Sequence, residues 1–138
     1  MPDNMTPEQR SRTMSRIRST NTKPEVLVRR MLHARRLRYR KHVRHLPGNP
    51  DIVFVSARVI VLINGDFWHG WRFPQWEHKM SDYWRAKIER NRKRDRRNIR
   101  RLRAAGWKVF RVWEHDIEAD CTALIDTIES AVRAASRQ

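Results

Sequence analysis

Residues 51–63 read Asp-Ile-Val-Phe-Val-Ser-Ala-Arg-Val-Ile-Val-Leu-Ile, and this stretch decides the fold. Two apolar runs, 51–55 and 59–63, flank the short turn Ser56-Ala57-Arg58, a pattern that predicts a β-hairpin with both strands buried. Because the turn is short, we expect Asp51 to lie roughly level with Ile63 and Asn64 at the open end of the hairpin.

The segments around the hairpin carry mostly helix signals. Thr22-Lys-Pro-Glu25 places a capping residue before a proline in the first turn, which indicates a helix start. Asp82 is a candidate cap of a long helix, and Gly106 is the candidate for its C-terminal cap. The predicted elements are helices that begin at Thr6 and Thr22, a half-exposed strand over 37–43, a long helix over 83–105, a strand over 107–113 and a last helix over 121–135.

This order of elements predicts an α/β fold, in which a small mixed β-sheet is flanked by helices. The 138 residues contain no internal repeat and no long linker, so we expect one domain over 1–138. Residues 1–20 are polar and basic with few apolar positions, and we interpret them as an N-terminal arm ordered by contact with a partner. Ligand sites in such sheets favour the strand ends and the loops that leave them, which points to Asp51 and to 64–70.

The charge of the chain indicates what that partner is. Lys and Arg total 31 against 15 Asp and Glu, giving a net charge of +16, and phosphate backbones are the usual partner of so basic a chain. No apolar run approaches the ~20 residues that span a bilayer, and no signal-peptide core is seen at the N-terminus. One cysteine, Cys121, cannot form an internal disulfide, so a reducing, bacterial-type cytoplasm and the nucleoid are the expected location.

Phosphodiester cleavage needs a metal that neutralises developing charge, a base that activates water and stabilisation of the leaving oxygen. The loop Asn64-Gly-Asp-Phe-Trp-His-Gly70 and residues elsewhere in the chain supply candidates for these groups. Mg²⁺ prefers carboxylate and carbonyl oxygens, so Asp51 and the backbone carbonyl of Ile63 are candidate ligands. His69 is the candidate general base, because an unperturbed imidazole titrates near pKa ~6.5. Asp95 is the candidate carboxylate that orients this imidazole.

Each of these residues also has an ordinary structural interpretation. A Pro-Asp pair is common in turns, Asp95 can pair with Arg92 or Arg96 on the helix surface, and Glu25 in a first helical turn complements the helix dipole. Composition and spacing therefore leave two classes open, a nuclease and a DNA-binding module without catalysis.

Several sequence blocks fall in a recognisable order along the chain. They are Met14-Ser-Arg-Ile, Thr22-Lys-Pro-Glu25, Leu46-Pro-Gly-Asn-Pro-Asp51, Asn64-Gly-Asp-Phe-Trp-His-Gly70, Tyr83-Trp-Arg-Ala-Lys-Ile88, Asn91, Asp95-Arg-Arg and Gly106-Trp-Lys-Val with Val-Trp-Glu114. With these blocks, the chain resembles the very short patch repair (Vsr) DNA mismatch endonucleases over about residues 10–118. The resemblance implies a restriction-endonuclease-like core and Mg²⁺-dependent nicking of one strand at a T·G mismatch.

The resemblance implies a role for each matching residue. Asp51 matches the metal-binding catalytic aspartate with the Ile63 carbonyl as second ligand, His69 the catalytic histidine with Asp95 as its partner, and Glu25 an acidic position near the site. The implied DNA contacts are the aromatic wedges Phe67, Trp68 and Trp84 and the mismatch-contacting residues Met14, Lys87 and Asn91. Wedge insertion costs a few kcal/mol of unstacking, and least where pairing is already defective.

The chain departs from the family pattern in two places. Asn64 stands where members commonly have a second histidine, and an amide cannot take a proton at pH 7, so we expect reduced activity or reliance on His69 alone. Asp66, Trp71, Phe73 and about His115 stand where the structural zinc ligands belong. One cysteine cannot build a thiolate-rich tetrahedral site, so we expect no structural zinc, with apolar packing in its place.

Two further hypotheses stay beside the T·G nicking enzyme: a strand nickase without mismatch preference and a non-catalytic DNA-binding module. The expected substrate is double-stranded DNA with a T·G mismatch, and mismatch-repair proteins are expected further partners. A monomer is expected because one strand is nicked, and the resemblance implies a cytosine methyltransferase as the biological setting. About half of the basic residues over 92–103 are expected to contact phosphates.

Overall fold

The computed structural model describes residues 22–66 and 81–136. The predicted N-terminal arm and the segment 67–80 lie outside the described residues. The elements are helix α2 (Lys23–Ala34), strands β1 (Arg40–Lys41), β2 (Ile52–Phe54) and β3 (Val59–Asn64), helix α4 (Asp82–Ala104), strand β4 (Lys108–Trp113) and helix α5 (Glu114–Ser136). None of these helices is long and apolar enough to cross a membrane.

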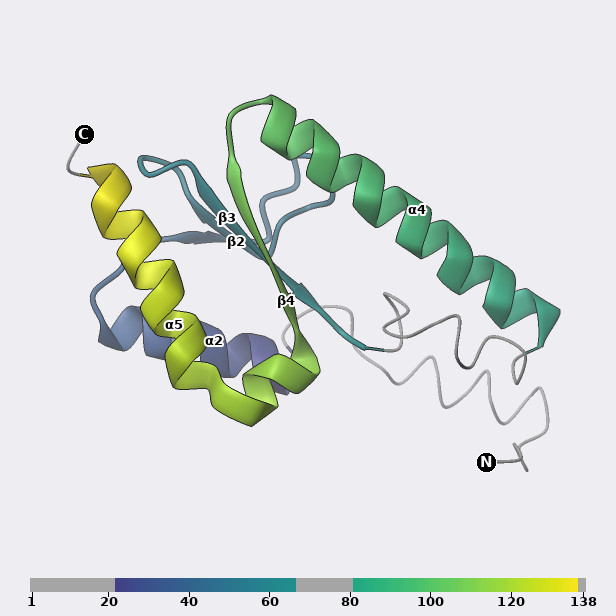
Figure 1. The fold of residues 1–138 in the computed structure, drawn as a ribbon, viewed down its shortest axis with the longest axis horizontal. Helices are drawn as coiled ribbons and strands as arrows, with labels where there is room; N and C mark the ends of the chain where they lie inside the picture. Colours follow the sequence, from purple (N-terminus) through teal and green to yellow (C-terminus); the bar gives the residue numbers. More distant parts are fainter. Residues whose placement is uncertain (1–21, 67–80, 137–138) are drawn as a thin grey trace.

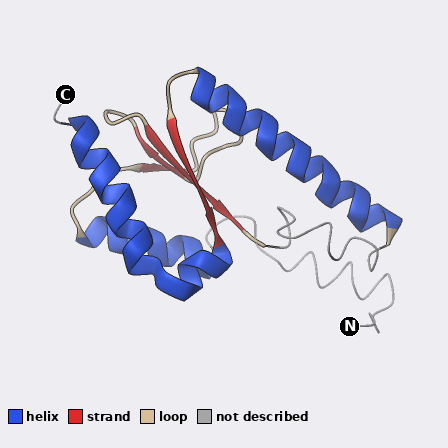
Figure 2. Ribbon diagram, in the orientation of Figure 1, coloured by secondary structure: helices blue, strands red, loops and turns tan. Residues whose placement is uncertain are grey.

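The four strands form one mixed sheet in the order β1-β2-β3-β4 (Figure 2). The predicted hairpin is confirmed, because β2 pairs antiparallel with β3 and Ile52 lies opposite Val61. Strand β4 pairs parallel with β3, with Asn64 opposite Trp113, because α4 carries the chain back along the sheet. The predicted α/β class with a small mixed sheet is therefore confirmed.

Helices cover both faces of this sheet, with α2 and α5 on one side and α4 on the other (Figure 1). Side chains alternate between the two faces along each strand. Ile52 and Phe54 of β2 pack in the cluster with α2 and α5, whereas Val53 between them packs with Ile99 and Leu102 of α4. Burial on both faces explains why the hairpin strands are continuously apolar rather than alternating.

Of the predicted helix caps, Thr22 and Gly106 are confirmed and Asp82 is replaced by Ser81. Thr22 caps α2 as predicted, and its hydroxyl accepts a hydrogen bond from the Glu25 amide at 3.4 Å. Ser81, rather than Asp82, caps α4, so the helix begins one residue earlier than expected, at Asp82 itself. Gly106 follows the end of α4 with φ +94°, the left-handed conformation that makes glycine a helix stop.

Two predicted elements have different limits in the structure. The strand expected over 37–43 contracts to Arg40–Lys41, and His42, with a left-handed φ of 51°, ends its regular pairing after Lys41. Helix α5 begins at Glu114 rather than at Cys121, with a non-helical residue, Asp120, inside it. The Asp120 carboxylate accepts a hydrogen bond from the Ala123 amide at 3.1 Å, so the part predicted from Cys121 starts with its own cap.

Candidate active site

Asp51 lies at the start of β2, at the open end of the hairpin. Its Oδ2 accepts a hydrogen bond from the backbone N–H of Ile63 at 2.8 Å, so the expectation that Asp51 lies level with Ile63 is confirmed. The hairpin register explains this contact, because Ile52 opposite Val61 brings the preceding residue beside the end of β3. The Ile63 peptide is thereby next to the Asp51 carboxylate, while its carbonyl as a metal ligand stays a prediction.

Glu25 reaches the same place from the first turn of α2. Its side chain is 3% exposed, and His42 Nε2 lies 2.6 Å from its Oε1 in a hydrogen bond. Arg29, one helical turn later, lies 3.7 Å from the same oxygen. A buried carboxylate is unfavourable unless it is paired and hydrogen-bonded, and these two partners compensate Glu25.

His42 is the residue that sequence reasoning missed, because it lies inside the half-exposed strand predicted over 37–43 and has no predicted role in the site. Its N–H and that of Val43 donate to the carbonyls of Asp51 and Pro50, each at 3.0 Å. Successive N–H groups of a regular strand point to opposite sides, so the left-handed backbone of His42 is what allows both bonds. A non-glycine residue in this conformation costs about 1–2 kcal/mol. The only sequence signal was an imidazole nine residues before Asp51.

Together Glu25, His42 and Asp51 form a cluster that we call the carboxylate–imidazole cluster. One ligand atom from each of the three lies within 4.8 Å of the others. Two carboxylates and an imidazole, beside the Ile63 peptide, make a donor set that suits a divalent cation. The two carboxylates therefore fit the Mg²⁺ that the resemblance implies, and the imidazole adds a nitrogen donor beside them.

A cavity of about 250 Å³ adjoins Asp51 and brings two further predicted residues to the site. Asn64, buried at the end of β3, and Asp95, from the middle of α4, both line it. The topology accounts for this meeting, because α4 crosses the sheet face beside the end of the hairpin. The cavity therefore places Asp51, Asn64 and Asp95 around one space large enough for a phosphate group.

Asp95 reaches the sheet, which its interpretation as a helix-surface residue did not consider. Arg111 of β4 lies 3.4 Å from its carboxylate, and Arg94 lies 4.0 Å from it. Arg111 also lies 4.6 Å over the Trp113 ring, and its Nε has no hydrogen-bond partner within the described ranges 22–66 and 81–136. Burial lowers the pKa of Arg111, while the Asp95 charge acts in the opposite direction.

The remaining predicted site residues divide into two groups. Trp84 is 7% exposed in the first turn of α4, with the Lys87 ammonium 5.3 Å from its ring centre. Asn91 follows Lys87 by one helical turn and shares its face of α4. The others, Met14, Phe67, Trp68 and His69, lie outside the described residues.

At the place of the family's zinc site the described residues form a polar pair. His115 Nδ1 lies 2.8 Å from Asp66 Oδ1, and its Nε2 lies 3.4 Å from Asp116. The Glu114 carboxylate accepts a hydrogen bond from the Asp66 amide at 3.2 Å. This carboxylate–imidazole contact joins the end of β3 to the start of α5 directly. Trp71 and Phe73, the expected apolar replacements, lie outside the described residues.

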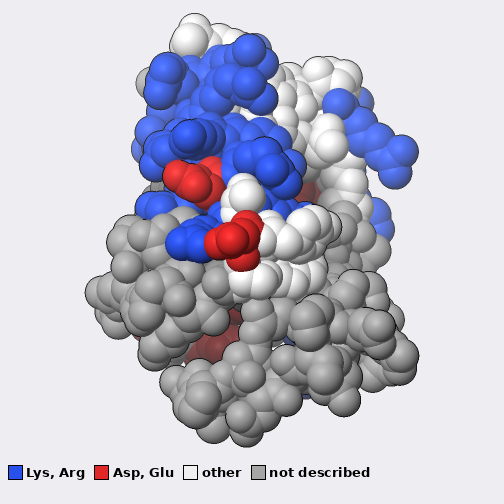
Figure 3. Space-filling model, turned by 90° about the vertical axis from the view of Figure 1, so that its right-hand side faces the viewer, with Lys and Arg blue, Asp and Glu red and all other residues white. Residues whose placement is uncertain are grey.

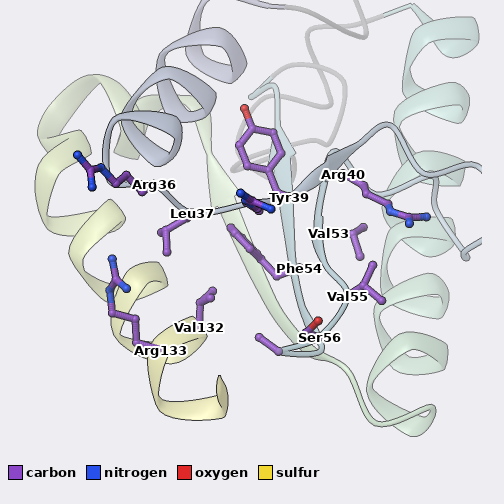
Figure 4. Close-up of a pocket in the computed structure, with 12 residues that line it drawn as sticks. Arg36, Leu37, Tyr39, Arg40, Val53, Phe54, Val55, Ser56, Val132 and Arg133 are labelled. Carbon is purple, nitrogen blue, oxygen red and sulfur yellow. The ribbon is translucent and has the colours of Figure 1, made fainter. Parts of the chain in front are cut away.

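Basic side chains gather on the side of the molecule where α4 lies (Figure 3). A larger cavity, about 780 Å³, lies at the other end of the hairpin, between the segment 36–40, the end of β2 and α5 (Figure 4). Among the described residues, its lining has four arginines over an apolar floor but no carboxylate, imidazole or amide side chain, so it offers poor ligands for a cation. The lining of this larger cavity therefore suits a divalent cation less well than that of the smaller cavity beside Asp51.

Comparison with known proteins identifies the family. The family model described as DNA mismatch endonuclease Vsr matches residues 2–75. The chain is 45% identical to the type II nicking enzyme V.XorIIP of Xanthomonas oryzae over 85% of its length and 88% of the relative. The chain belongs to the DNA mismatch endonuclease Vsr family.

Other Vsr-related proteins extend the match over most of the chain. The type II nicking enzyme V.NmeDIP of Neisseria meningitidis is 38% identical over 95% of this chain and 90% of the relative. The DNA mismatch endonuclease Vsr of Escherichia coli is 34% identical over 76% of this chain and 69% of its own. Membership of the Vsr family makes the protein a DNA endonuclease, as the resemblance implied.

Proposed function

We propose that this enzyme nicks one strand of double-stranded DNA at a T·G mismatch, with Mg²⁺ bound at Asp51. The observation that carries the proposal is the position of Asp51, which belongs both to the carboxylate–imidazole cluster with Glu25 and to the cavity that Asp95 of the basic helix α4 lines. The match to the Vsr family model and the name of the Escherichia coli relative, DNA mismatch endonuclease Vsr, support mismatch cleavage.

Asp51, Glu25 and the Ile63 carbonyl are the oxygen donors that would hold the ion. A bound divalent ion would neutralise the charge that develops on the phosphate during cleavage. His69 accepts the proton of the attacking water, and Asp95 holds that imidazole in the productive tautomer. Asn64 donates its amide N–H to a phosphate oxygen or to water, but it takes no proton.

The basic residues of α4 position the duplex by its phosphates, without reading sequence. Phe67, Trp68 and Trp84 are the proposed wedges, and Met14, Lys87 and Asn91 contact the mismatch. For Trp84 this role requires movement, because the ring is nearly buried in the first turn of α4. The enzyme acts as a monomer in this scheme, because only one strand is cut, and mismatch-repair proteins are further partners.

A strand-labelled cleavage assay tests the proposal. We expect a duplex with one T·G pair to be cut on the T strand when Mg²⁺ is present, and the matched duplex to be spared. Without Mg²⁺, both duplexes should stay intact. Intact T·G duplex at every divalent ion tested, with retained salt-sensitive binding, would instead select a non-catalytic DNA-binding module.

A second candidate is a strand nickase without mismatch preference. It is favoured by one specific observation, since several relatives are named type II nicking enzymes rather than mismatch endonucleases. Equal cutting of the matched and mismatched duplexes in the same assay would select this candidate.

A further inference from the structure

Glu25, His42 and Asp51 combine oxygen and nitrogen donors at the place where a nuclease cation is needed. Mg²⁺ is a hard ion that prefers oxygen donors, whereas imidazole nitrogen suits first-row transition ions. Mn²⁺ prefers the same carboxylate and carbonyl ligands as Mg²⁺, and as a first-row divalent ion it also binds at sites with nitrogen donors such as imidazole. We infer that His42 is a nitrogen ligand of the active-site cation, which makes this site bind Mn²⁺ through a donor that Mg²⁺ does not use.

The position of His42 is built by the backbone rather than left to a flexible side chain. Its left-handed φ of 51° and its N–H bond to the Asp51 carbonyl fix the residue directly beside Asp51. The hydrogen bond from His42 Nε2 to Glu25 then fixes the ring. The imidazole is therefore held against both carboxylates before any ion arrives, and such preorganisation favours binding.

The partial exposure of the His42 imidazole agrees with a role as a metal ligand. The His42 side chain is 25% exposed, so an ion can reach it from solvent, whereas Glu25 beneath it is almost fully buried. When the ion binds, the proton shared in the His42–Glu25 hydrogen bond leaves to solvent, because a ligating imidazole nitrogen carries no proton. Arg29 remains beside Glu25 and keeps that carboxylate oriented.

A purely structural bridge is the alternative, in which His42 only satisfies the buried Glu25. Arg29 already lies 3.7 Å from the same Glu25 oxygen, so the carboxylate is not dependent on His42 alone for a partner. The two roles differ in one observable, which is whether a nitrogen atom is bonded to the bound metal.

Electron spin-echo envelope modulation of Mn²⁺ bound to the full chain measures that bond directly. We expect nitrogen modulation from a histidine ligand in the wild-type protein, with the frequencies shifted when histidine is labelled with ¹⁵N. His42→Asn should abolish the modulation and weaken Mn²⁺ binding about tenfold or more. Mg²⁺ affinity, measured by competition with Mn²⁺, should change less than about twofold.

The choice of variants separates a lost ligand from a damaged fold. Asparagine tolerates the left-handed backbone at position 42 better than most residues, so His42→Asn should stay folded. His33→Gln is the matched control, because His33 is exposed near the end of the same helix that carries Glu25. Asp51→Asn should remove most Mn²⁺ binding, which places the ion at this cluster.

The inference rests on the proposed function, and the two fail in different ways. Bound Mn²⁺ without nitrogen modulation in the wild-type protein, or modulation that survives His42→Asn, would overturn the ligand role of His42. The nicking assay would be untouched by that result. Conversely, nitrogen modulation without DNA cleavage at any divalent ion would overturn the proposed function and leave His42 as a ligand.

Discussion

Substitution of Asp51 by asparagine and by alanine separates the two contributions of this carboxylate. Its Oδ2 accepts a 2.8 Å hydrogen bond from the Ile63 N–H, so it holds the hairpin end as well as facing the proposed cation. A hydrogen bond to a charged group contributes about 1.5–3 kcal/mol, and a neutral one about 0.5–1.5 kcal/mol. The asparagine variant would keep an acceptor oxygen for the Ile63 N–H, whereas the alanine variant would remove that acceptor.

We therefore expect Asp51→Asn to destabilise the protein by about 1 kcal/mol and Asp51→Ala by about 2 kcal/mol. Both variants also remove one negative charge beside Glu25, which offsets part of the loss equally in each. The difference between them, about 1 kcal/mol, is the cleaner quantity, and it corresponds to about 4 °C in melting temperature for a domain of this size. Thermal unfolding followed by circular dichroism measures it.

Both variants should lose nicking activity by at least about a thousandfold, or about 4 kcal/mol of transition-state stabilisation, because neither carries the charge that holds the ion. Salt-sensitive DNA binding should remain. Asp51→Asn cutting at a rate near that of the wild type would refute the catalytic assignment. Equal melting temperatures of the two variants would refute the stabilising role of the Ile63 hydrogen bond.

Three further predictions concern the basic helix, the end of that helix and the zinc position. Arg97→Ala on α4 should weaken binding to all duplexes alike and lower by about one the slope of log binding constant against log salt concentration. Arg36→Ala at the remote cavity is the control and should leave this slope unchanged. Equal slopes for the two variants would contradict a role of α4 in phosphate binding. Gly106→Ala should lower the free energy of unfolding by about 1–2 kcal/mol, because φ is +94° at this position, and the added Cβ meets only the flexible Arg58 guanidinium, at 3.7 Å. An unchanged melting temperature would contradict backbone strain as the cause. Elemental analysis of the purified protein should find less than stoichiometric zinc, and one tightly held zinc per chain would show that the site is built from ligands other than cysteine.

The local features of the fold follow from sequence alone. Runs of consecutive apolar residues on both sides of Ser56-Ala57-Arg58 predict the hairpin, and the register of this hairpin places Asp51 beside Ile63. The caps at Thr22 and Gly106 also follow, because a capping hydroxyl and a left-handed glycine act within a few residues. The early start of α5 did not follow, since a turn before Asp120 is stabilised by packing of Ile117 in the core rather than by a strong start signal.

Sequence patterns do not predict the contacts between segments that are far apart in the chain. No sequence pattern connects Arg111 with Asp95, because one lies on β4 and the other on α4, and only the packing of the helix against the sheet brings them within 3.4 Å. The surface interpretation of Asp95 considered helix neighbours alone. The described part of the site is thus completed by residues whose spacing in the chain carries no periodic signal.

The sequence by itself determined the family, the DNA partner and the hairpin that carries Asp51, because motifs, net charge and apolar runs are properties of order and composition. Only the tertiary structure decided that His42 and Glu25 meet Asp51, within 4.8 Å. The physical reason is the left-handed backbone of His42, which lets its own N–H and that of Val43 both bond to the segment before β2. The same backbone places the His42 imidazole against the buried carboxylate of Glu25. Such a conformation is favoured by the surrounding packing rather than by histidine itself, so no local sequence pattern predicts it.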